Sequence, residues 1–371
     1  MISVERVSDP TEILAFPHRI YRDDPAWVPP LDVWVQKRLA PTHPFFKDAE
    51  LQLLVARREG EVVGTISVLR DRRHEAVKGE KVAFFGFFET VDDPAVARVL
   101  FDAAADVARG WGAAVLRGPR NLSRVEETGL CVEGHAFAPP MLAGHHPAYY
   151  QALVEGEGFV EHHDVLAYHA ELYLPDGTPR AFPEGLSRKA DAVDIPDLDV
   201  HACSFFHLTR DLSLAYDVFV EAFRDVPENT PMPREQFLSL GRVFLAISSQ
   251  KMLQLATAGG KPAGFALCFP EMNEAVRAAR GHLFPFGWAS MLAAYAGIRT
   301  ASFKLIGVLP EHRRSGLHAL MARKAFEGVR AAGYRRLEAS LIDSRNKQSR
   351  GVVEGAGMEV YKRYRIYERG V

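Results

Sequence analysis

An internal repeat constrains the fold of this chain more than any other feature of its sequence. VEGEGF at residues 154–159 returns as VEGAGM at residues 353–358, and GEVVGTISVL at 60–69 returns as GKPAGFALCF at 260–269. A chain of 371 residues is longer than one hydrophobic core usually supports. The repeat therefore predicts two domains of the same design.

The segments between these anchors predict the same elements in the same order. Residues 96–119 and 317–341 each have the pattern of a helix at 3.6-residue period, a glycine C-cap (Gly112 or Gly333) and a strand. Each half thus predicts helices, two antiparallel strands, a central strand, a long helix, another strand, a helix and a final hairpin.

A segment rich in Pro, Gly and charge, PDGTPRAFPEGLSRKADAVDIPD, separates the two copies. Such composition is typical of a domain boundary. We expect a first domain at residues 1–174, a linker at 175–196 and a second domain at 197–371.

The segment 302–321, SFKLIGVLPEHRRSGLHALM, has the pattern of a buried strand, a short loop and a helix. Pro310 cannot donate to a sheet ladder, so the strand ends before it. Gly316 allows a ligand to approach the backbone, and the helix after it presents free N–H groups and a positive dipole end. Two adjacent arginines, Arg313 and Arg314, favour an anion there. The pattern indicates a pyrophosphate cradle.

This loop resembles motif A of the GNAT superfamily, the acyl-CoA-dependent N-acyltransferases. Their pattern is Arg/Gln-x-x-Gly-x-Gly/Ala after a strand that ends in V-x-P-E; Arg313 and Gly316 match it, whereas His318 stands in the last small position. The repeated order of elements is also the GNAT order, so the resemblance covers nearly the whole chain. It implies an α/β fold of two tandem GNAT-like domains, each a mixed, mostly antiparallel central sheet flanked by helices. FPFGW at 284–288 and KRYRIYE at 362–368 resemble bacterial tandem-GNAT proteins whose substrates are not established.

The resemblance implies that acetyl-CoA or another acyl-CoA binds to the C-terminal half. The strand before the cradle would splay from its neighbour and pair its backbone with pantetheine, and the loop would hold the pyrophosphate. The implied cofactor-binding residues are Ile306, Gly307, Val308, Arg313, Arg314, Ser315, Gly316, Leu317, His318 and Asn346.

The acid that protonates the departing thiolate is left open by the sequence. Many members of the family use a tyrosine at the position that holds Val353 here. Either another donor replaces it or solvent protonates the thiolate directly. Tyr361, Tyr364 and Tyr367 on the last hairpin are substitute donors, with Tyr364 as the candidate acid, and packing of a final strand is the alternative for each.

The general base is also open. Asp343 follows the predicted fifth strand at the mouth of the splay, and we expect it as the base; capping the helix that contains Asn346 is the alternative. Glu271 and Glu274, at the end of the third strand of this half, are the other candidates.

The N-terminal half lacks a cradle at the corresponding position, where it has FFGFFETVDDPAVAR. Asp92 and Asp93 would repel a pyrophosphate, and one of them is expected as a helix N-cap before Pro94. This half instead has a long polar loop that we expect to bind the substrate or to pack. The candidate substrate-binding residues are Asn121, Glu126, His146 and Tyr150. Cys131 and His135 are too few for a zinc site, so no metal is predicted.

Composition excludes several functions. The net charge of −2 does not favour nucleic acid as a partner. The charged N-terminus and three scattered cysteines favour a cytoplasmic protein. The apolar segment 283–298 is interrupted by Pro285 and short for a bilayer span. It predicts a buried or lid helix, with contact to a membrane surface as the alternative and no stable insertion.

The leading hypothesis is a cytoplasmic acyl-CoA-dependent N-acyltransferase, with acetyl transfer as the first expectation. A small-molecule amine would attack the thioester directly in the C-terminal half. The alternative is a non-catalytic protein that binds acyl-CoA or another ligand on a decayed transferase fold, which the missing tyrosine and the absent first cradle would explain. The sequence indicates neither the acceptor nor the oligomeric state.

Overall fold

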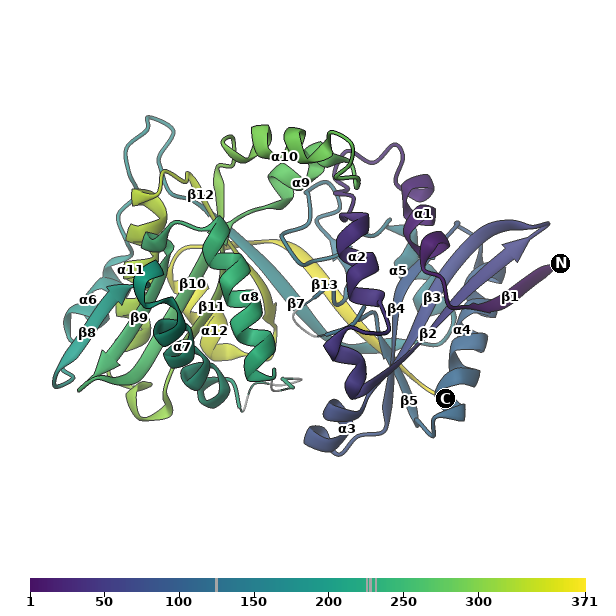
Figure 1. Cartoon of the computed structure of the whole chain (residues 1–371), viewed down its shortest axis with the longest axis horizontal. Helices are drawn as coiled ribbons and strands as arrows, with labels where there is room; N and C mark the ends of the chain where they lie inside the picture. The colour runs from purple at the N-terminus through teal and green to yellow at the C-terminus, as the bar shows by residue number, and fades with distance from the viewer. Residues whose placement is uncertain (124–125, 225, 227–228, 231) are drawn as a thin grey trace. The chain divides into compact units, whose positions relative to one another are not determined.

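The computed structural model describes residues 1–371 except 124–125, 225, 227–228 and 231, and it divides the chain into two compact units (Figure 1). Unit 1 comprises Met1–Val165, Asn273–Ala296 and Lys362–Val371; unit 2 comprises Leu166–Met272 and Gly297–Tyr361. Neither unit is one continuous stretch, because two segments of the second half belong to unit 1. The boundaries at residues 174 and 197 stay a prediction drawn from the repeat.

Unit 1 contains a mixed sheet in the order β1-β2-β3-β4-β5-β13, with β6 paired to β13. β1 to β4 are antiparallel neighbours, β4 and β5 run parallel, and β13 returns antiparallel to β5. The strands are β1 Ile2–Val7, β2 Ala49–Arg58, β3 Glu61–Asp71, β4 Val82–Thr90, β5 Val115–Gly118, β6 Leu130–Glu133 and β13 Glu359–Gly370.

The long helix α4 (Pro94–Gly110) supplies much of the core of unit 1. Its apolar residues recur at helical spacing, and Val96, Leu100 and Phe101 pack with β-strand side chains in one buried cluster. The Asp93 carboxylate accepts a hydrogen bond from Ala95 N at 2.8 Å, which confirms the predicted N-cap. The other helices of this unit are α1 Thr11–Ile20, α2 Asp32–Leu39, α3 Arg72–Lys78, α5 Tyr149–Gly156, α9 Asn273–Ala279 and α10 Gly287–Tyr295, with a 3-10 helix η1 at Pro44–Lys47.

The sheet strands of unit 2 follow the order β7-β12-β11-β10-β9-β8. β8 to β11 are antiparallel neighbours, and β11 runs parallel to β12. The strands are β7 Val160–Glu171, which starts in unit 1, β8 Leu198–Ala202, β9 Leu253–Ala258, β10 Lys261–Pro270, β11 Thr300–Val308 and β12 Arg336–Asp343.

Helix α11 (Leu317–Ala331) plays in unit 2 the part that α4 plays in unit 1. Its buried residues, among them Leu317, Met321 and Val329, join the β-strand side chains in the main cluster. The other helices are α6 Glu184–Asp191, α7 Leu208–Ala222, α8 Arg234–Ile247 and α12 Lys347–Gly355, with 3-10 helices η2 Phe205–His207, η3 Gln250–Met252 and η4 Pro310–His312.

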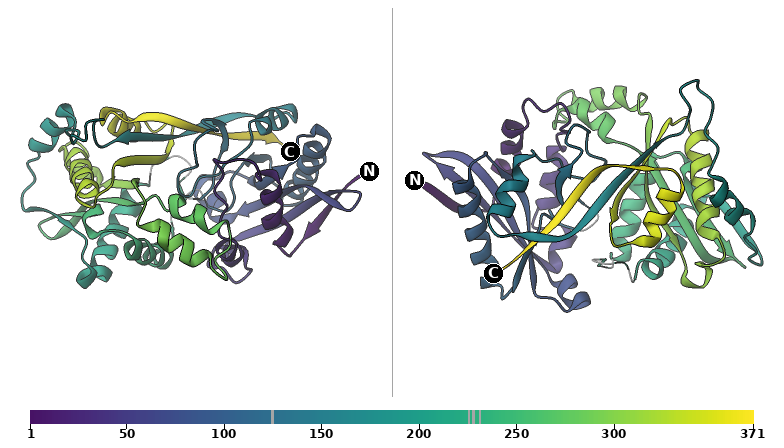
Figure 2. Two further views of the ribbon diagram at one scale, coloured as in Figure 1. Left: turned by 90° about the horizontal axis from the view of Figure 1, so that it is seen from above. Right: turned by 180° about the vertical axis from the view of Figure 1, so that it is seen from behind.

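The element order confirms the repeat and corrects its ends. Both copies contain a strand, two helices, an antiparallel strand pair, a central strand, a long helix, a strand and a helix. Each copy starts with a short strand that the sequence did not indicate, and each ends in one long strand, β7 or β13, rather than a hairpin (Figure 2). The prediction of a final hairpin was wrong because HHDVLAYHAEL and YKRYRIYE contain no Gly, Pro or Asn that would favour a hairpin turn.

The apolar segment 283–298 is not a buried helix. α10 has no buried residue, and Ile298 alone among the large apolar side chains of this segment is buried. The expectation of burial was wrong because α10 is apolar on all sides, so its periodicity does not identify a face that packs. The alternatives, a lid helix or contact with a membrane surface, stay predictions. In the described part of the chain, no helix combines the length and hydropathy that crossing a membrane requires.

Candidate active site

The two parallel central strands of unit 2 separate where the sequence predicts a splay. β11 and β12 pair from Thr300 with Arg336 to Phe303 with Ala339, and in the described residues the ladder ends there although both strands continue. The opposite edge of β11 stays paired with β10 up to Val308. The predicted pantetheine-binding residues Ile306 to Val308 therefore lie on the part of β11 beyond the splay.

The predicted cradle follows directly. η4 carries the chain from β11 into a turn, and Gly316 is the N-cap of α11 with a φ of 86°. The first N–H groups of a helix have no partner within it, so the turn and the start of α11 present backbone donors and a positive dipole end. The Ser315 hydroxyl donates to His312 O at 2.8 Å and accepts from Leu317 N at 3.3 Å, which fixes the loop.

Gly316 is required at this position for two reasons. Its positive φ is unfavourable for any residue with a Cβ, and a Cβ there would clash with the carbonyl oxygen of Lys189 at the end of α6. We expect Gly316→Ala to lower the free energy of unfolding by about 2–4 kcal/mol. Gly351→Ala is the matched control, because a Cβ on Gly351 in α12 meets nothing within 4 Å; it should raise stability by about 0.5–1 kcal/mol. Urea unfolding measures both, and equal effects would contradict this role of Gly316.

Basic side chains surround the cradle. The Arg313 guanidinium donates to Ala222 O of α7 at 3.2 Å, which holds it beside the loop, while Arg314 is exposed. Burial and the neighbouring Arg313 charge lower the pKa of His318 below its ordinary value. His318 is thus expected to be neutral at pH 7, so the positive charge of the loop comes from the arginines.

A buried polar cluster lies on the strands at the splay. Ser302 and Glu338 are register partners on β11 and β12, and the Ser302 hydroxyl donates to Glu338 Oε2. Lys304 Nζ donates to Ser340 Oγ at 2.7 Å and lies 3.7 Å from Glu338 Oε2. The Glu338 side chain is 3% exposed, and its other oxygen, Oε1, has no hydrogen-bond partner among the described residues. A buried carboxylate oxygen without a partner is costly unless a ligand or water satisfies it.

The predicted base, Asp343, is buried and already engaged. Its carboxylate accepts from Arg345 Nε at 3.0 Å, from Arg345 Nη2 at 2.8 Å and from the backbone N of Arg345 at 2.9 Å. Asn346 is the N-cap of α12, where its Oδ1 accepts from Ser349 N at 3.0 Å. Of the other two candidate bases, Glu271 is buried and Glu274 is exposed. The roles of these residues in catalysis and CoA binding stay predictions.

The predicted acid, Tyr364, belongs to unit 1, whereas the cradle belongs to unit 2. Tyr364 is fully buried and lies opposite Cys131 in the pairing of β13 with β6. Lys362 Nζ lies 5.9 Å from the centre of its ring and donates to Gly134 O at 2.9 Å and Phe137 O at 2.8 Å. No single unit brings Tyr364 and the cradle together, so its role stays a prediction.

The four predicted substrate-binding residues lie in unit 1, where the structure gives each of them a partner. Asn121 Oδ1 accepts from Phe87 N at 2.7 Å, and Glu126 pairs with Arg38. His146 Nδ1 accepts from Cys131 N at 3.1 Å, and burial lowers the pKa of this imidazole to about 3. The ring of His146 lies 6.0 Å from that of Tyr150.

Tyr150 leads to a group that the sequence did not single out, Glu89 near the end of β4. Glu89 Oε2 lies 2.7 Å from Tyr150 Oη and 2.8 Å from Tyr21 Oη. Tyr21 Oη also lies 2.8 Å from the carbonyl oxygen of His145. A tyrosine hydroxyl has one proton, so both of these contacts are hydrogen bonds only if Tyr21 donates to the His145 carbonyl and a protonated Glu89 donates to Tyr21. Consistently, burial raises the pKa of Glu89 to about 8.

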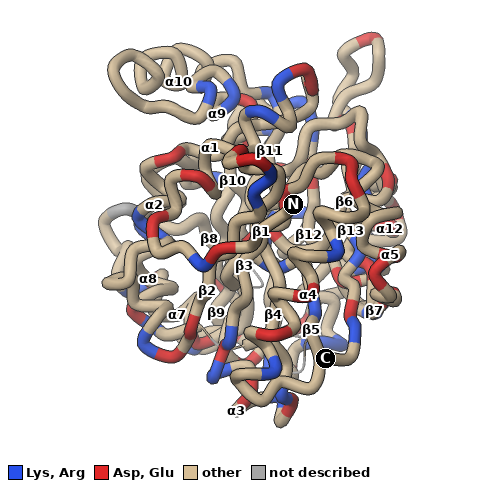
Figure 3. The backbone as a smooth tube through the Cα atoms, turned by 90° about the vertical axis from the view of Figure 1, so that its right-hand side faces the viewer, with Lys and Arg blue, Asp and Glu red and all other residues tan. Residues whose placement is uncertain are grey.

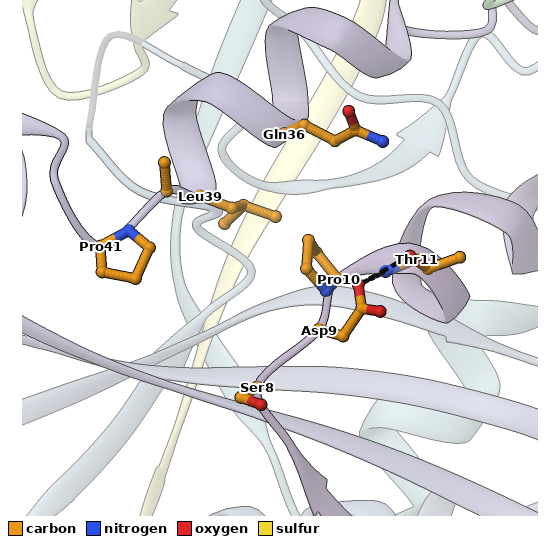
Figure 4. Close-up of a pocket in the computed structure, with 8 residues that line it drawn as sticks. Ser8, Asp9, Pro10, Thr11, Gln36, Leu39 and Pro41 are labelled. Atoms are coloured by element: carbon orange, nitrogen blue, oxygen red, sulfur yellow. Dashed lines mark hydrogen bonds between the residues drawn. The ribbon is translucent and has the colours of Figure 1, made fainter.

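Sequence reasoning missed Glu338, which is buried on β12, and Glu89, which is half-buried near the end of β4. Glu338 lies in RRLEASL and Glu89 in FFGFFETV, and an acidic residue within an otherwise apolar strand was the available signal. A pocket elsewhere in unit 1 is lined by Ser8, Asp9, Pro10, Thr11, Gln36, Leu39, Ala40 and Pro41 (Figure 4). It contains none of the candidate residues.

Comparison with known proteins identifies relatives over the whole chain. The bacterial ceramide synthase of Caulobacter vibrioides is 32% identical over 383 residues, which cover 100% of this chain and 98% of that protein. Protein YghO of Escherichia coli is 29% identical over 370 residues, covering 98% of this chain and 93% of YghO. No family model matches the chain.

Solved structures share the fold at low identity. A tandem GNAT protein from the clavulanic acid biosynthesis pathway has a TM-score of 0.56 at 15% identity, with 100% of this chain and 98% of that chain covered. A GCN5-related N-acetyltransferase from Sphaerobacter thermophilus has a TM-score of 0.55 at 16% identity, with coverage of 100% and 95%. These likenesses confirm the predicted α/β fold with tandem GNAT-like architecture. The chain therefore has a GNAT-like fold and belongs to the family that includes the Caulobacter protein.

Proposed function

We propose that this protein is an acyl-CoA-dependent N-acyltransferase whose reaction takes place in unit 2. One observation carries the proposal: the cradle formed by Arg313, Gly316 and the start of α11 adjoins a splay at which Glu338 has an unpartnered, buried oxygen. The helix N-terminus suits the pyrophosphate of CoA, and the splay suits pantetheine, which would add to β11 as a strand does.

We further propose a long-chain amine as the acceptor and a long-chain acyl-CoA as the donor. The Caulobacter relative is named a ceramide synthase, and a ceramide is the amide of a fatty acid with a long-chain amino alcohol. Coverage of both chains is nearly complete, so the relative and this protein share the same overall design. Acetyl transfer to a small amine is the alternative within the same chemistry.

Bound acyl-CoA would supply the thioester. The nitrogen of the neutral amine forms the new bond to the carbonyl carbon, and the C–S bond breaks. Glu338 Oε1 would accept the proton that the amine nitrogen loses, because this oxygen is buried, unpartnered and acceptor-only when ionised. Lys304 Nζ lies 3.7 Å from the other oxygen, Oε2, so it leaves Oε1 open to the amine. The thiolate takes a proton from solvent, which its ordinary pKa of about 8.5 allows.

Removal of the Arg313 guanidinium should weaken CoA binding. Arg313 is the cradle arginine that α7 holds in place, and a charge-assisted contact to phosphate contributes about 1.5–3 kcal/mol. We expect Arg313→Ala to raise the Kd for CoA by about 10- to 100-fold in calorimetric titration. Lys324→Ala, on an exposed part of α11, is the matched control and should bind as the wild type does. Equal affinity of all three proteins would place the cofactor elsewhere.

Turnover distinguishes the enzyme from the non-catalytic alternative. Release of free CoA is measured with acetyl-CoA or palmitoyl-CoA, each with and without sphinganine as the amine. Amine-dependent release with palmitoyl-CoA supports the proposed donor and acceptor. Binding of acyl-CoA without release for any amine in a wider set would instead support the ligand-binding protein.

A further inference from the structure

The segment around α10 exposes an unusual set of large apolar side chains. Phe284 and Phe286 are 74% and 75% exposed, and they flank Pro285 just before the helix. Within α10 and at its end, Trp288, Leu292 and Tyr295 are also exposed. Monomeric soluble proteins rarely expose so many neighbouring apolar side chains unless the surface binds something. We call these five residues the α10 patch.

Two exposed arginines flank the α10 patch, while the acidic residues Glu274 and Asp32 lie at α9 and at the base of the segment. The sequence contains no acidic residue between Glu274 and Glu311, whereas Arg277 and Arg280 precede the patch and are exposed. Figure 3 shows α10 in tan and Lys and Arg positions in blue along the neighbouring α9. An apolar surface with aromatic residues and adjacent arginines is complementary to the anionic headgroups and acyl chains of a lipid surface.

The base of this segment is held within unit 1, so the patch has a defined support. Asp32 Oδ2 accepts from His282 Nδ1 at 2.7 Å, and Asp32 N donates to Gly281 O at 2.9 Å. The rings of His18 and His282 stack with centroids 5.5 Å apart. These contacts join the residue before Leu283 to α1 and α2, and leave the aromatic side chains of α10 outside the core.

We propose that the α10 patch docks this protein onto the surface of an anionic phospholipid bilayer. Phe284, Phe286 and Trp288 enter the interfacial region, and Arg277 and Arg280 face the phosphates. A bilayer surface fits better than a second protein because the patch combines an apolar, aromatic centre with the exposed Arg277 and Arg280 beside it. α10 is too short to span a bilayer, so the patch would lie at its surface. The inference concerns a surface of unit 1 and holds with or without the proposed reaction.

Flotation with vesicles tests it without acyl-CoA or amine. The wild type should bind vesicles of phosphatidylcholine with phosphatidylglycerol, and bind phosphatidylcholine alone about tenfold more weakly. The double variant Phe284→Ser/Phe286→Ser should lose binding by tenfold or more. Trp34→Ser is the matched control, because Trp34 in α2 is 50% exposed, as is Trp288, and should bind as the wild type does.

Two outcomes would overturn the proposal. One is wild-type protein that stays with the unbound fraction, and the other is a double variant that floats as the wild type does. Light scattering identifies the competing occupant: a wild-type dimer that the double variant abolishes, without vesicle binding by either protein, assigns the patch to a second copy of the chain. Unchanged urea unfolding of the double variant is expected, since the replaced side chains are exposed.

Discussion

Glu338→Gln is expected to reduce acyl transfer by about 10²- to 10⁴-fold while CoA still binds. Glutamine keeps the size of the side chain and can still accept from Ser302, but it cannot take up a proton from the attacking amine. Glu338 lies on β12 at the splay, away from the loop that would hold the pyrophosphate. The loss should therefore appear in kcat, and the Kd for CoA should change little.

Two further variants separate catalysis from structure. Glu327→Gln changes an exposed carboxylate on α11 and should leave kcat unchanged. Asp343→Asn tests the base that the sequence favoured; because its carboxylate holds Arg345, we expect lower stability with most of the transfer rate retained. A Glu338→Gln protein with wild-type kcat, or an Asp343→Asn protein that folds normally but is inactive, would reverse this assignment.

The sequence predicted the parts of the fold that depend on local pattern. The long helices α4 and α11 were visible from apolar spacing, and their C-terminal glycines, Gly112 and Gly333, do have positive φ. The strand, loop and helix around Gly316 were predictable for the same reason, because they are neighbours in the chain. That this loop binds pyrophosphate stays a prediction. Asp93 likewise caps α4, the helix that begins directly after it.

Features that depend on distant pairing were not predictable in this way. β13 contributes its C-terminal residues to unit 1, where Tyr367 pairs with Gly118, and no local pattern states which strand lies beside which. The candidate base shows the same limit. Glu338 became a candidate base only when the strand register placed it opposite Ser302 with one carboxylate oxygen unpartnered. Asp343 was the candidate base from the sequence because residue spacing did not reveal its ion pair with Arg345.

Glu89 should make the stability of the protein fall as pH rises. Burial raises its pKa from the ordinary 4.5 to about 8, so between these values the folded state keeps a proton that the unfolded chain has lost. In that window fewer protons are bound in the unfolded state, and the free energy of unfolding decreases by about 1.4 kcal/mol per pH unit for this one group. The contribution is full below pH 4.5 and is lost by pH 8 and above.

The variant Glu89→Gln isolates this effect, because an amide resembles the protonated carboxyl and does not titrate. Both tyrosine hydroxyls contact the same oxygen, Oε2, so glutamine places either its oxygen or its NH₂ group there and loses one of the hydrogen bonds. The comparison with the wild type therefore uses the pH dependence of stability rather than the stability at one pH. Between pH 5 and pH 8 the wild type should lose on the order of 3 kcal/mol relative to the variant in urea unfolding. Histidines with lowered pKa, such as His146, act in both proteins and cancel in the difference. The charge of Glu127 contributes to the raised pKa of Glu89, so its effect is part of the difference that is measured. Glu133→Gln, at an exposed carboxylate, is the control, and its stability should depend on pH as that of the wild type does.

Parallel curves of stability against pH for wild type and Glu89→Gln would contradict the prediction. They would mean that Glu89 is ionised at neutral pH and that Tyr21 donates to it rather than to His145.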